Sequence, residues 1–476
     1  MWAGASQWGR QLLGLATTIV LARLLEPSAF GLYSLAMVWI GLCALCVDFG
    51  LGTALIQKKS LSYEELNGVF WLGLALSVSL VAIVWYASPA VGRLSGDVRI
   101  SPLLRALSLT LVGTALSSVH QALAARAIDF RKIAHIELMS TAGGSVAAVT
   151  WATITGSVWS LVLQSLVAAL LSAALYWREA KWFPSVRIAK MRVGGLLPFS
   201  SNLAGFNVVN FVARNVDNLL IGRFLGAESL GYYSLAYRIM LFPLQNISSV
   251  LGRVMFAVLS SVQDDDRRVR EGFNRLSKYV ALVTCPLMFG VLVFVGDAVA
   301  TVFGDRWAPV AALLRILALV GMAQSLGTNV GVIYMTKGRT DMMFRWGVAA
   351  TAVITVSIVL GLQWGLLGVA LGYLAANVVV FAPGIMLPLS LIAGRFRDFL
   401  SSVAPAFVLG SVACVIALAA RTGLTAAGVP VAATLILESA FLVTAYVAMI
   451  RWKRPALVVE IREMFEDVRR GSARHG

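Results

Sequence analysis

Two stretches of this sequence place polar and charged side chains along one face of an otherwise apolar helix. In residues 196–225 these side chains are Asn207, Asn210, Arg214, Asp217 and Asn218. In residues 229–259 they are Ser234, Arg238, Gln245, Ser249 and Arg253. Arginine pairs with phosphate oxygens through parallel hydrogen bonds, so faces with more arginine than carboxylate suit an anionic ligand. We call these two faces the polar stripes.

Asp48, Asp217 and Glu438 are carboxylates within apolar segments. Glu438 stands alone on the last span and is assigned no role, which leaves Asp48 and Asp217. Inside a membrane, a carboxylate beside arginine can exchange its partner for a cation, which makes both residues candidates for coupling to H⁺ or Na⁺. The alternative for Asp217 is an ion pair with Arg214 three residues earlier on the same helix. For Arg253 the alternative is a side chain that extends to the membrane surface.

The composition identifies the solvent of these segments. Hydrophobic residues make up 59% of the 476 residues and charged residues 13%, whereas soluble proteins carry about 25% charged residues. Mean hydropathy is +0.83. The composition predicts an all-α, polytopic membrane protein. The net charge of +16 lies in short loops between apolar runs, which indicates anionic lipid rather than nucleic acid as its partner.

Fourteen segments are long and apolar enough to span a bilayer, at about 20 residues each. They are 4–25, 30–56, 67–88, 103–125, 134–154, 157–177, 196–225, 229–259, 277–300, 309–335, 343–362, 365–392, 400–420 and 430–450. We expect residues 261–278 to be a solvated connector. Residues 457–468 are expected to form an amphipathic helix on the membrane surface.

The loop charges predict how the chain is oriented. Nearly all loop lysines and arginines fall on one side, at 58–59, 126–132, 178–192, 267–278, 337–345, 395–397 and in the C-terminal tail. The other side holds only Arg93, Arg99, Arg306 and Arg421. Positive loops stay in the cytoplasm, so we expect both termini to be cytoplasmic.

The sequence repeats itself after 200 residues. Arg23, Leu25, Gly31 and residues 33–36 (Tyr-Ser-Leu-Ala) recur at 223, 225, 231 and 233–236. Six spans separate the copies, so both cross the membrane in the same direction, as in transporters built from parallel repeats. We expect an N-terminal lobe at 1–178, a basic linker at 179–195, a C-terminal lobe at 196–394, two further helices at 395–450 and a basic amphipathic tail at 451–476. The polar stripes would then line a central cavity, because a charged residue facing lipid costs about 2.5–3.5 kcal/mol.

Motifs for chemistry on a nucleotide or metal are missing. There is no GxxxxGK[ST], GxSxG or HExxH, and the three histidines have no ligand-like neighbours. Cys43, Cys46, Cys285 and Cys414 all lie in apolar runs and are expected to be small buried side chains. We therefore expect no catalytic residue, metal or cofactor, and transport rather than catalysis.

Residues 212–226 read VARNVDNLLIGRFLG, residues 230–236 read LGYYSLA, and residues 22–33 read ARLLEPSAFGLY. These segments resemble the Wzx-type flippases of lipid-linked oligosaccharides, a branch of the superfamily that also contains the MATE exporters and the lipid II flippase, and they are most similar to the colanic-acid exporters. The resemblance covers the first twelve spans well and the last two loosely.

The resemblance implies a multi-pass protein of the bacterial inner membrane that moves an undecaprenyl-pyrophosphate-linked oligosaccharide to the outer leaflet for exopolysaccharide or lipopolysaccharide synthesis, by alternating access. Its partners would be that lipid, membrane lipids, H⁺ or Na⁺, and other polysaccharide assembly proteins. The alternatives are a cation-coupled, MATE-like exporter of small molecules and a non-transporting scaffold. We expect Arg238 and Arg214 to contact the pyrophosphate. The further candidates for substrate binding are Arg10, Arg253, Asn207, Asn210 and Gln245.

Overall fold

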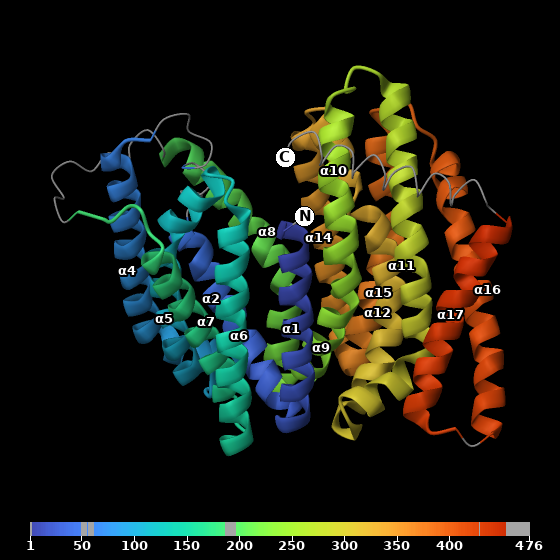
Figure 1. Ribbon diagram of the computed structural model, residues 1–476, viewed down its shortest axis with the longest axis horizontal. Helices are drawn as coiled ribbons and strands as arrows, with labels where there is room; N and C mark the ends of the chain where they lie inside the picture. The colour runs from blue at the N-terminus through green and yellow to red at the C-terminus, as the bar shows by residue number, and fades with distance from the viewer. Residues whose placement is uncertain (1, 49–54, 56–60, 186–196, 428, 454–476) are drawn as a thin grey trace. The chain divides into compact units, whose positions relative to one another are not determined.

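The computed structural model describes residues 2–48, 55, 61–185, 197–427 and 429–453. Within these ranges the chain forms fourteen long helices and no strand (Figure 1). In chain order they are α1 (Trp2–Leu24), α2 (Pro27–Asp48), α4 (Tyr63–Ser95), α5 (Ile100–Arg126), α6 (Phe130–Thr155), α7 (Trp159–Arg178), α8 (Leu197–Phe224), α9 (Gly226–Pro243) continued by α10 (Ser249–Ser260), α11 (Asp266–Val302), α12 (Ala308–Gly327) continued by α13 (Val330–Thr336), α14 (Thr340–Gly361), α15 (Gly365–Ser390), α16 (Phe396–Ala426) and α17 (Val431–Lys453).

These helices confirm the predicted fold class and the predicted number of spans. Nine described segments meet a strict test of length and hydropathy for crossing a membrane, and one of them, Thr340–Ser390, contains both α14 and α15. The helices outside these nine are α1, α6, α8 and the α9–α10 helix. Three of these four, α1, α8 and the α9–α10 helix, carry residues that we predicted for the site. Their greater polarity distinguishes these helices from the spans that meet the test.

One connector differs from the prediction. Residues 261–278 were expected to be a solvated connector between two spans, whereas most of this segment is helical, because α11 begins at Asp266 and runs for 37 residues. Asp265 caps this helix, because its side chain accepts a hydrogen bond from the backbone N–H of Arg268. Asp266 in the first turn is acidic and interacts favourably with the positive end of the helix dipole. The predicted helix at 457–468 lies outside the described residues.

The chain divides into two compact units, residues 1–235 and 236–476. In the first unit, α6 packs against α1 and α7, while α5 packs against α2, α4 and α7. Small residues permit close approach of these helices. A Cβ added to Gly144 of α6 would lie 2.6 Å from the carbonyl oxygen of Gln164 on α7. Helix packing through small residues is typical of membrane proteins, in which apolar lipid does not drive helices together.

The beginnings of α2 and α9 cross within the first unit at two glycines. A Cβ on Gly31 would lie 1.6 Å from the carbonyl oxygen of Ala227, and one on Gly231 would lie 1.9 Å from that of Pro27. Both pairs, Gly31 with Gly231 and Pro27 with Ala227, are separated by 200 residues. Each copy therefore contacts the other through the same surface, as a two-fold relation requires. The two copies of the repeat therefore meet in a local contact with approximate two-fold symmetry.

The segment 181–185, which follows α7, lies against α4. The Tyr63 hydroxyl donates to the Phe183 carbonyl at 2.7 Å, and the Trp71 indole donates to the Ser185 carbonyl at 2.8 Å. The Asn67 side chain accepts from the backbone N–H of Ser185 at 2.8 Å. The Trp182 ring packs near Phe70 and His120. We call residues 181–185 the strap. The strap lies within the predicted linker, 179–195.

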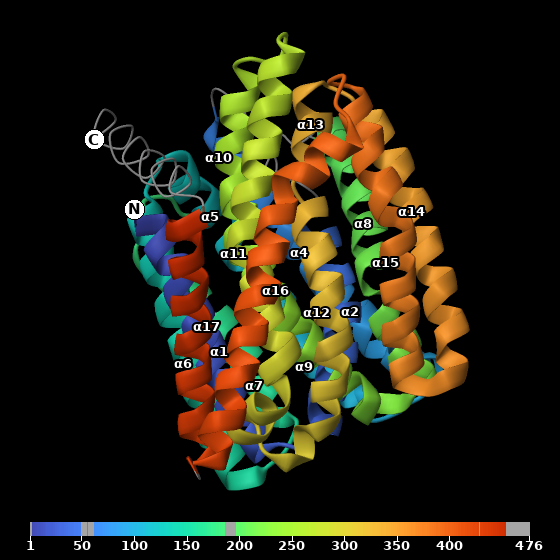
Figure 2. The same ribbon diagram turned by 90° about the vertical axis from the view of Figure 1, so that its right-hand side faces the viewer.

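In the second unit α11 is the central helix, in contact with α12, α16 and α17. Phe273 of α11 stacks on Phe399 of α16, and both rings are fully buried. Figure 2 shows α16 and α17 side by side, with α11 behind them. The loop between α10 and α11 projects at one end (Figure 1), where Lys337 forms an ion pair with Asp266 and Arg270 donates to the carbonyls of Ile392 and Ala393.

The compact units and the predicted lobes describe different properties of the chain. The lobes were defined by the repeat, with a boundary at 179–195, whereas the units are defined by packing and meet at Leu235. Packing assigns α8 and the start of α9 to the first unit, because Gly41 and Leu35 of α2 contact Phe211 and Gly222 of α8. The lobe boundaries stay a prediction.

We expect Gly31→Ala to destabilise the protein because the added methyl group has no space against the Ala227 carbonyl; forced contacts of this kind cost about 1–3 kcal/mol. Gly73→Ala is the matched control, since a Cβ there meets nothing within 4 Å. The measurement is the midpoint of thermal unfolding in detergent. Equal midpoints for the two variants would contradict the close crossing.

Candidate functional site

Asp217 of α8 is a buried carboxylate of the first unit. Its side chain is 5% exposed and accepts a hydrogen bond from the Tyr233 hydroxyl of α9 at 3.0 Å. The backbone N–H of Asn218 donates to its other oxygen at 2.8 Å. Arg214 instead donates its Nε to the Asn210 side chain at 3.3 Å. The alternative of an intrahelical Arg214–Asp217 ion pair is therefore wrong.

The structure brings together Arg214 and Asn210, two of the predicted substrate-binding residues. Both side chains are exposed at the protein surface and lie one helical turn apart on α8. Because amides are neutral, Asn210 orients the guanidinium without cancelling its charge. The remaining donors of Arg214 suit phosphate oxygens.

Arg10 of α1 has a carboxylate partner that sequence reasoning missed. Its Nη1 lies 2.9 Å from Oε2 of Glu137 on α6, and the two side chains are 38% and 25% exposed. The only signal in the sequence was Glu137 itself, a carboxylate about two turns into an apolar helix. Its position does not show which helix packs against it. Arg10 is thus neutralised in this structure.

The second polar stripe continues less regularly than predicted. Arg238 and Gln245 are both exposed side chains of the second unit. A π-helical turn, Leu244–Ser248, follows Pro243, which has no N–H to continue the helical ladder. A π turn holds more residues than an α turn. The α-helical period of the backbone is therefore interrupted between Arg238 and the residues that follow this turn.

Three candidates cannot be placed by their side chains. Those of Asp48, Asn207 and Arg253 lie outside the described part of the structure. Their backbones belong to α2, α8 and α10.

A buried polar cluster in the second unit was not predicted. The Gln324 side chain of α12 donates to the Tyr373 hydroxyl of α15 at 2.6 Å and lies 3.4 Å from the Asn377 side-chain oxygen. The Tyr237 hydroxyl, from α9, is 3.4 Å from that of Tyr373. Tyr237 directly precedes Arg238, so the cluster fixes α9 beside this arginine. Scattered single polar residues on three helices gave no stripe to detect.

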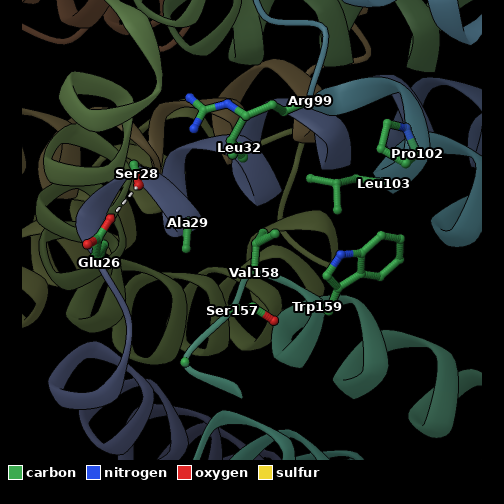
Figure 3. Close-up of a pocket in the computed structure, with 11 residues that line it drawn as sticks. Glu26, Ser28, Ala29, Leu32, Arg99, Pro102, Leu103, Ser157, Val158 and Trp159 are labelled. Atoms are coloured by element: carbon green, nitrogen blue, oxygen red, sulfur yellow. Dashed lines mark hydrogen bonds between the residues drawn. The ribbon is translucent and has the colours of Figure 1, made fainter.

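A cavity of about 390 Å³ opens at one end of the first unit (Figure 3). Glu26, Arg99 and Ser157 line it from the connections before α2, α5 and α7, together with the Trp159 ring. Arg99 binds the Asp97 carboxylate at 2.7 Å. Burial raises the pKa of Asp97, but hydrogen bonds and the charge of Arg99 outweigh this and lower it. None of the predicted site residues whose side chains the structure describes lines the cavity.

Sequence comparison assigns the chain to a family. The profile described as "Polysaccharide biosynthesis protein" matches residues 20–312, which include α2 through α11 and both polar stripes. The chain belongs to this polysaccharide biosynthesis family. The resemblance stated from residues 22–33, 212–226 and 230–236 is confirmed.

Several relatives are named for the synthesis of different polysaccharides. The chain is similar to the lipopolysaccharide biosynthesis protein WzxC of Escherichia coli, with 29% identity over 77% of this chain and 75% of the relative. It is 28% identical to the teichuronic acid biosynthesis protein TuaB of Bacillus subtilis over 78% of both chains. The succinoglycan biosynthesis transport protein ExoT of Rhizobium meliloti is 27% identical over 76% of this chain and 73% of its own.

Solved structures share the fold. The lipid II flippase MurJ in an inward closed conformation superposes with a TM-score of 0.73 over 96% of this chain and 99% of MurJ, at 14% identity. An inward-facing MATE multidrug transporter gives 0.65 over 81% and 94%, at 15% identity. At these identities the likeness establishes the fold alone.

We expect Tyr233→Phe to destabilise the protein more than Tyr33→Phe, its counterpart in the repeat. Tyr233 donates to a carboxylate, worth about 1.5–3 kcal/mol, whereas the Tyr33 hydroxyl contacts that of Ser165 at 2.7 Å, worth about 0.5–1.5 kcal/mol. The measurement is the free energy of unfolding in mixed micelles. A double-mutant cycle with Asp217→Asn isolates the pair, and zero coupling would refute the bond.

Proposed function

We propose that this protein flips an undecaprenyl-pyrophosphate-linked oligosaccharide from the cytoplasmic to the outer leaflet of the inner membrane by alternating access. The family match over residues 20–312 carries the proposal, because the relatives named for lipopolysaccharide, teichuronic acid and succinoglycan share a task rather than a sugar. The fold shared with MurJ supports it. The protein is in this proposal a transporter and not an enzyme.

The basic loops support a cytoplasmic location for both termini. With this orientation the positive loops face the leaflet in which the substrate is made, and they attract anionic headgroups there. Membrane lipids and other polysaccharide assembly proteins are the further partners proposed.

Arg238 and Arg214 are proposed to contact the pyrophosphate. Both side chains are exposed on membrane helices, and Arg214 has an amide rather than a carboxylate beside it. Arg10 would have to leave Glu137 to bind phosphate, which makes it a weaker contact. The other proposed contacts are Asn207, Asn210, Gln245 and Arg253.

The energy for transport is proposed to come from gradients across the membrane. A negative charge that moves outward across about 100 mV, inside negative, gains about 2.3 kcal/mol, so a pyrophosphate that crosses uncompensated gains about twice that. Asp217, and Asp48 on α2, would exchange H⁺ or Na⁺. The burial of Asp217 supports this role, because a buried carboxylate is more stable with a bound cation.

Arg238→Ala should abolish flipping because the headgroup loses a cationic partner. Arg238→Lys should keep part of the activity, since it retains the charge but not the planar fork. The measurement is accessibility of a fluorescent lipid-linked oligosaccharide in proteoliposomes, at equal reconstituted protein. Arg267→Ala is the control, because this side chain is 78% exposed and pairs with Glu271 at the start of α11.

Normal flipping by Arg238→Ala would remove this residue from the site. If the wild-type protein flips no lipid-linked oligosaccharide, the scaffold alternative gains. If it moves small cations instead, the exporter alternative does.

We expect flipping to accelerate under an imposed inside-negative potential, and Asp217→Asn to weaken the response to a pH or sodium gradient more than it weakens substrate binding. The experiment clamps the potential at zero with valinomycin and potassium and then varies each gradient alone. Rates indifferent to the potential and to both gradients would indicate a passive scramblase, and the coupling roles of Asp48 and Asp217 would be withdrawn.

A further inference from the structure

Three charged side chains of the second unit meet where α11, α16 and α17 pack together. Arg421 of α16 donates a hydrogen bond from its Nη2 to the Asp297 carboxylate of α11. Its Nε lies 3.7 Å from Oε1 of Glu438 on α17. Glu438 could not be assigned a role from the sequence, because its partners lie on other helices. We call these residues the carboxylate–arginine triad.

Glu438 is the unusual member of the triad. Its side chain is 0% exposed, whereas Asp297 and Arg421 are 29% and 30% exposed. Among the described residues, neither of its carboxylate oxygens has a hydrogen-bond partner, since the contact with Arg421 is longer than a hydrogen bond. A buried carboxylate that accepts no hydrogen bond is strongly destabilised when ionised.

The charges of the triad do not balance. One guanidinium faces two carboxylates, so the group carries a net charge of −1 if both acids are ionised. Asp297 takes the hydrogen bond and leaves Glu438 with the weaker share of Arg421. The charged groups that face Glu438 from the two helices packed against α17 are Asp297 and Arg421. One bound cation therefore neutralises the triad.

We propose that the triad is a proton-binding site in which Glu438 carries the proton. A metal ion is the poorer fit, because the site offers two carboxylates with a guanidinium beside them, and no group of three metal-ligating side chains occurs among the described residues. The proton neutralises the acid of the triad that accepts no hydrogen bond from a described residue and so holds α16 and α17 against α11. The site is independent of the proposed lipid transport, and two of its three residues, Arg421 and Glu438, lie on the helices that follow the repeat.

Labelling with dicyclohexylcarbodiimide tests this assignment, since the reagent reacts with protonated carboxyl groups in apolar surroundings. The reconstituted full-length protein is labelled over a range of pH, and the modified residues are located by mass spectrometry. We expect labelling of Glu438 at neutral pH that falls as the pH rises. Glu137 is the internal control: it has Arg10 to itself at 2.9 Å and should stay unlabelled.

Two variants shift the charge in opposite directions. Asp297→Asn leaves Arg421 to Glu438 alone, so Glu438 should ionise and lose its label. Arg421→Gln removes the cation, so labelling should persist to higher pH. An infrared band of a protonated carboxylic acid, present in the wild type and lost in Glu438→Gln, checks the result without a chemical reagent.

Several outcomes would overturn the proposal. They are an unlabelled Glu438 in the wild-type protein at neutral pH together with no change in the infrared band on Glu438→Gln, and labelling of Glu438 that is the same in folded Asp297→Asn as in the wild type. Equal labelling of Glu137 and Glu438 would show that the reagent reports access alone and would also refute the assignment.

Discussion

Within a bilayer, polar groups must find their partners inside the protein, and this constraint shapes the chain from backbone to side chain. Helices satisfy the backbone internally. Hydroxyl groups then use the same backbone: Thr17 donates to the Leu13 carbonyl at 2.8 Å and Thr18 to that of Gly14 at 2.7 Å. Such bonds to the preceding turn let polar residues enter a membrane helix without a partner elsewhere.

Several charged groups are satisfied instead by contacts between helices. Arg10 joins α1 to α6 through Glu137, and Asp217 joins α8 to α9 through Tyr233. The triad joins α11, α16 and α17 through Arg421. The three arrangements differ in net charge. Arg10 and Glu137 form a neutral ion pair, Asp217 is a carboxylate whose hydrogen-bond donors are neutral, and the triad has two carboxylates for one guanidinium. Unbalanced negative charge favours a bound cation in the last two arrangements but not in the first.

Features that depend on composition and period could be read from the sequence, and features that depend on the neighbouring helix could not. Hydropathy predicted the spans, and the repeat predicted that Gly31 and Gly231 are equivalent, which their mutual contact supports. The pairing of Arg10 with Glu137 was invisible because nothing in either helix names its neighbour. The helical period beyond Pro243 could not be predicted, because the π turn adds a residue that a strict 3.6-residue period does not include.

The strap at residues 181–185 has a consequence for the order in which the protein is made. Tyr63, Asn67 and Trp71, which form hydrogen bonds with it, precede it in the chain, as do Phe70 and His120 beside Trp182. It can therefore dock while the ribosome is still synthesising α8, and domains form from the N-terminus onward during synthesis. The strap then covers α4 before any helix of the second repeat enters the membrane. This order would keep the two similar halves from exchanging helices during insertion.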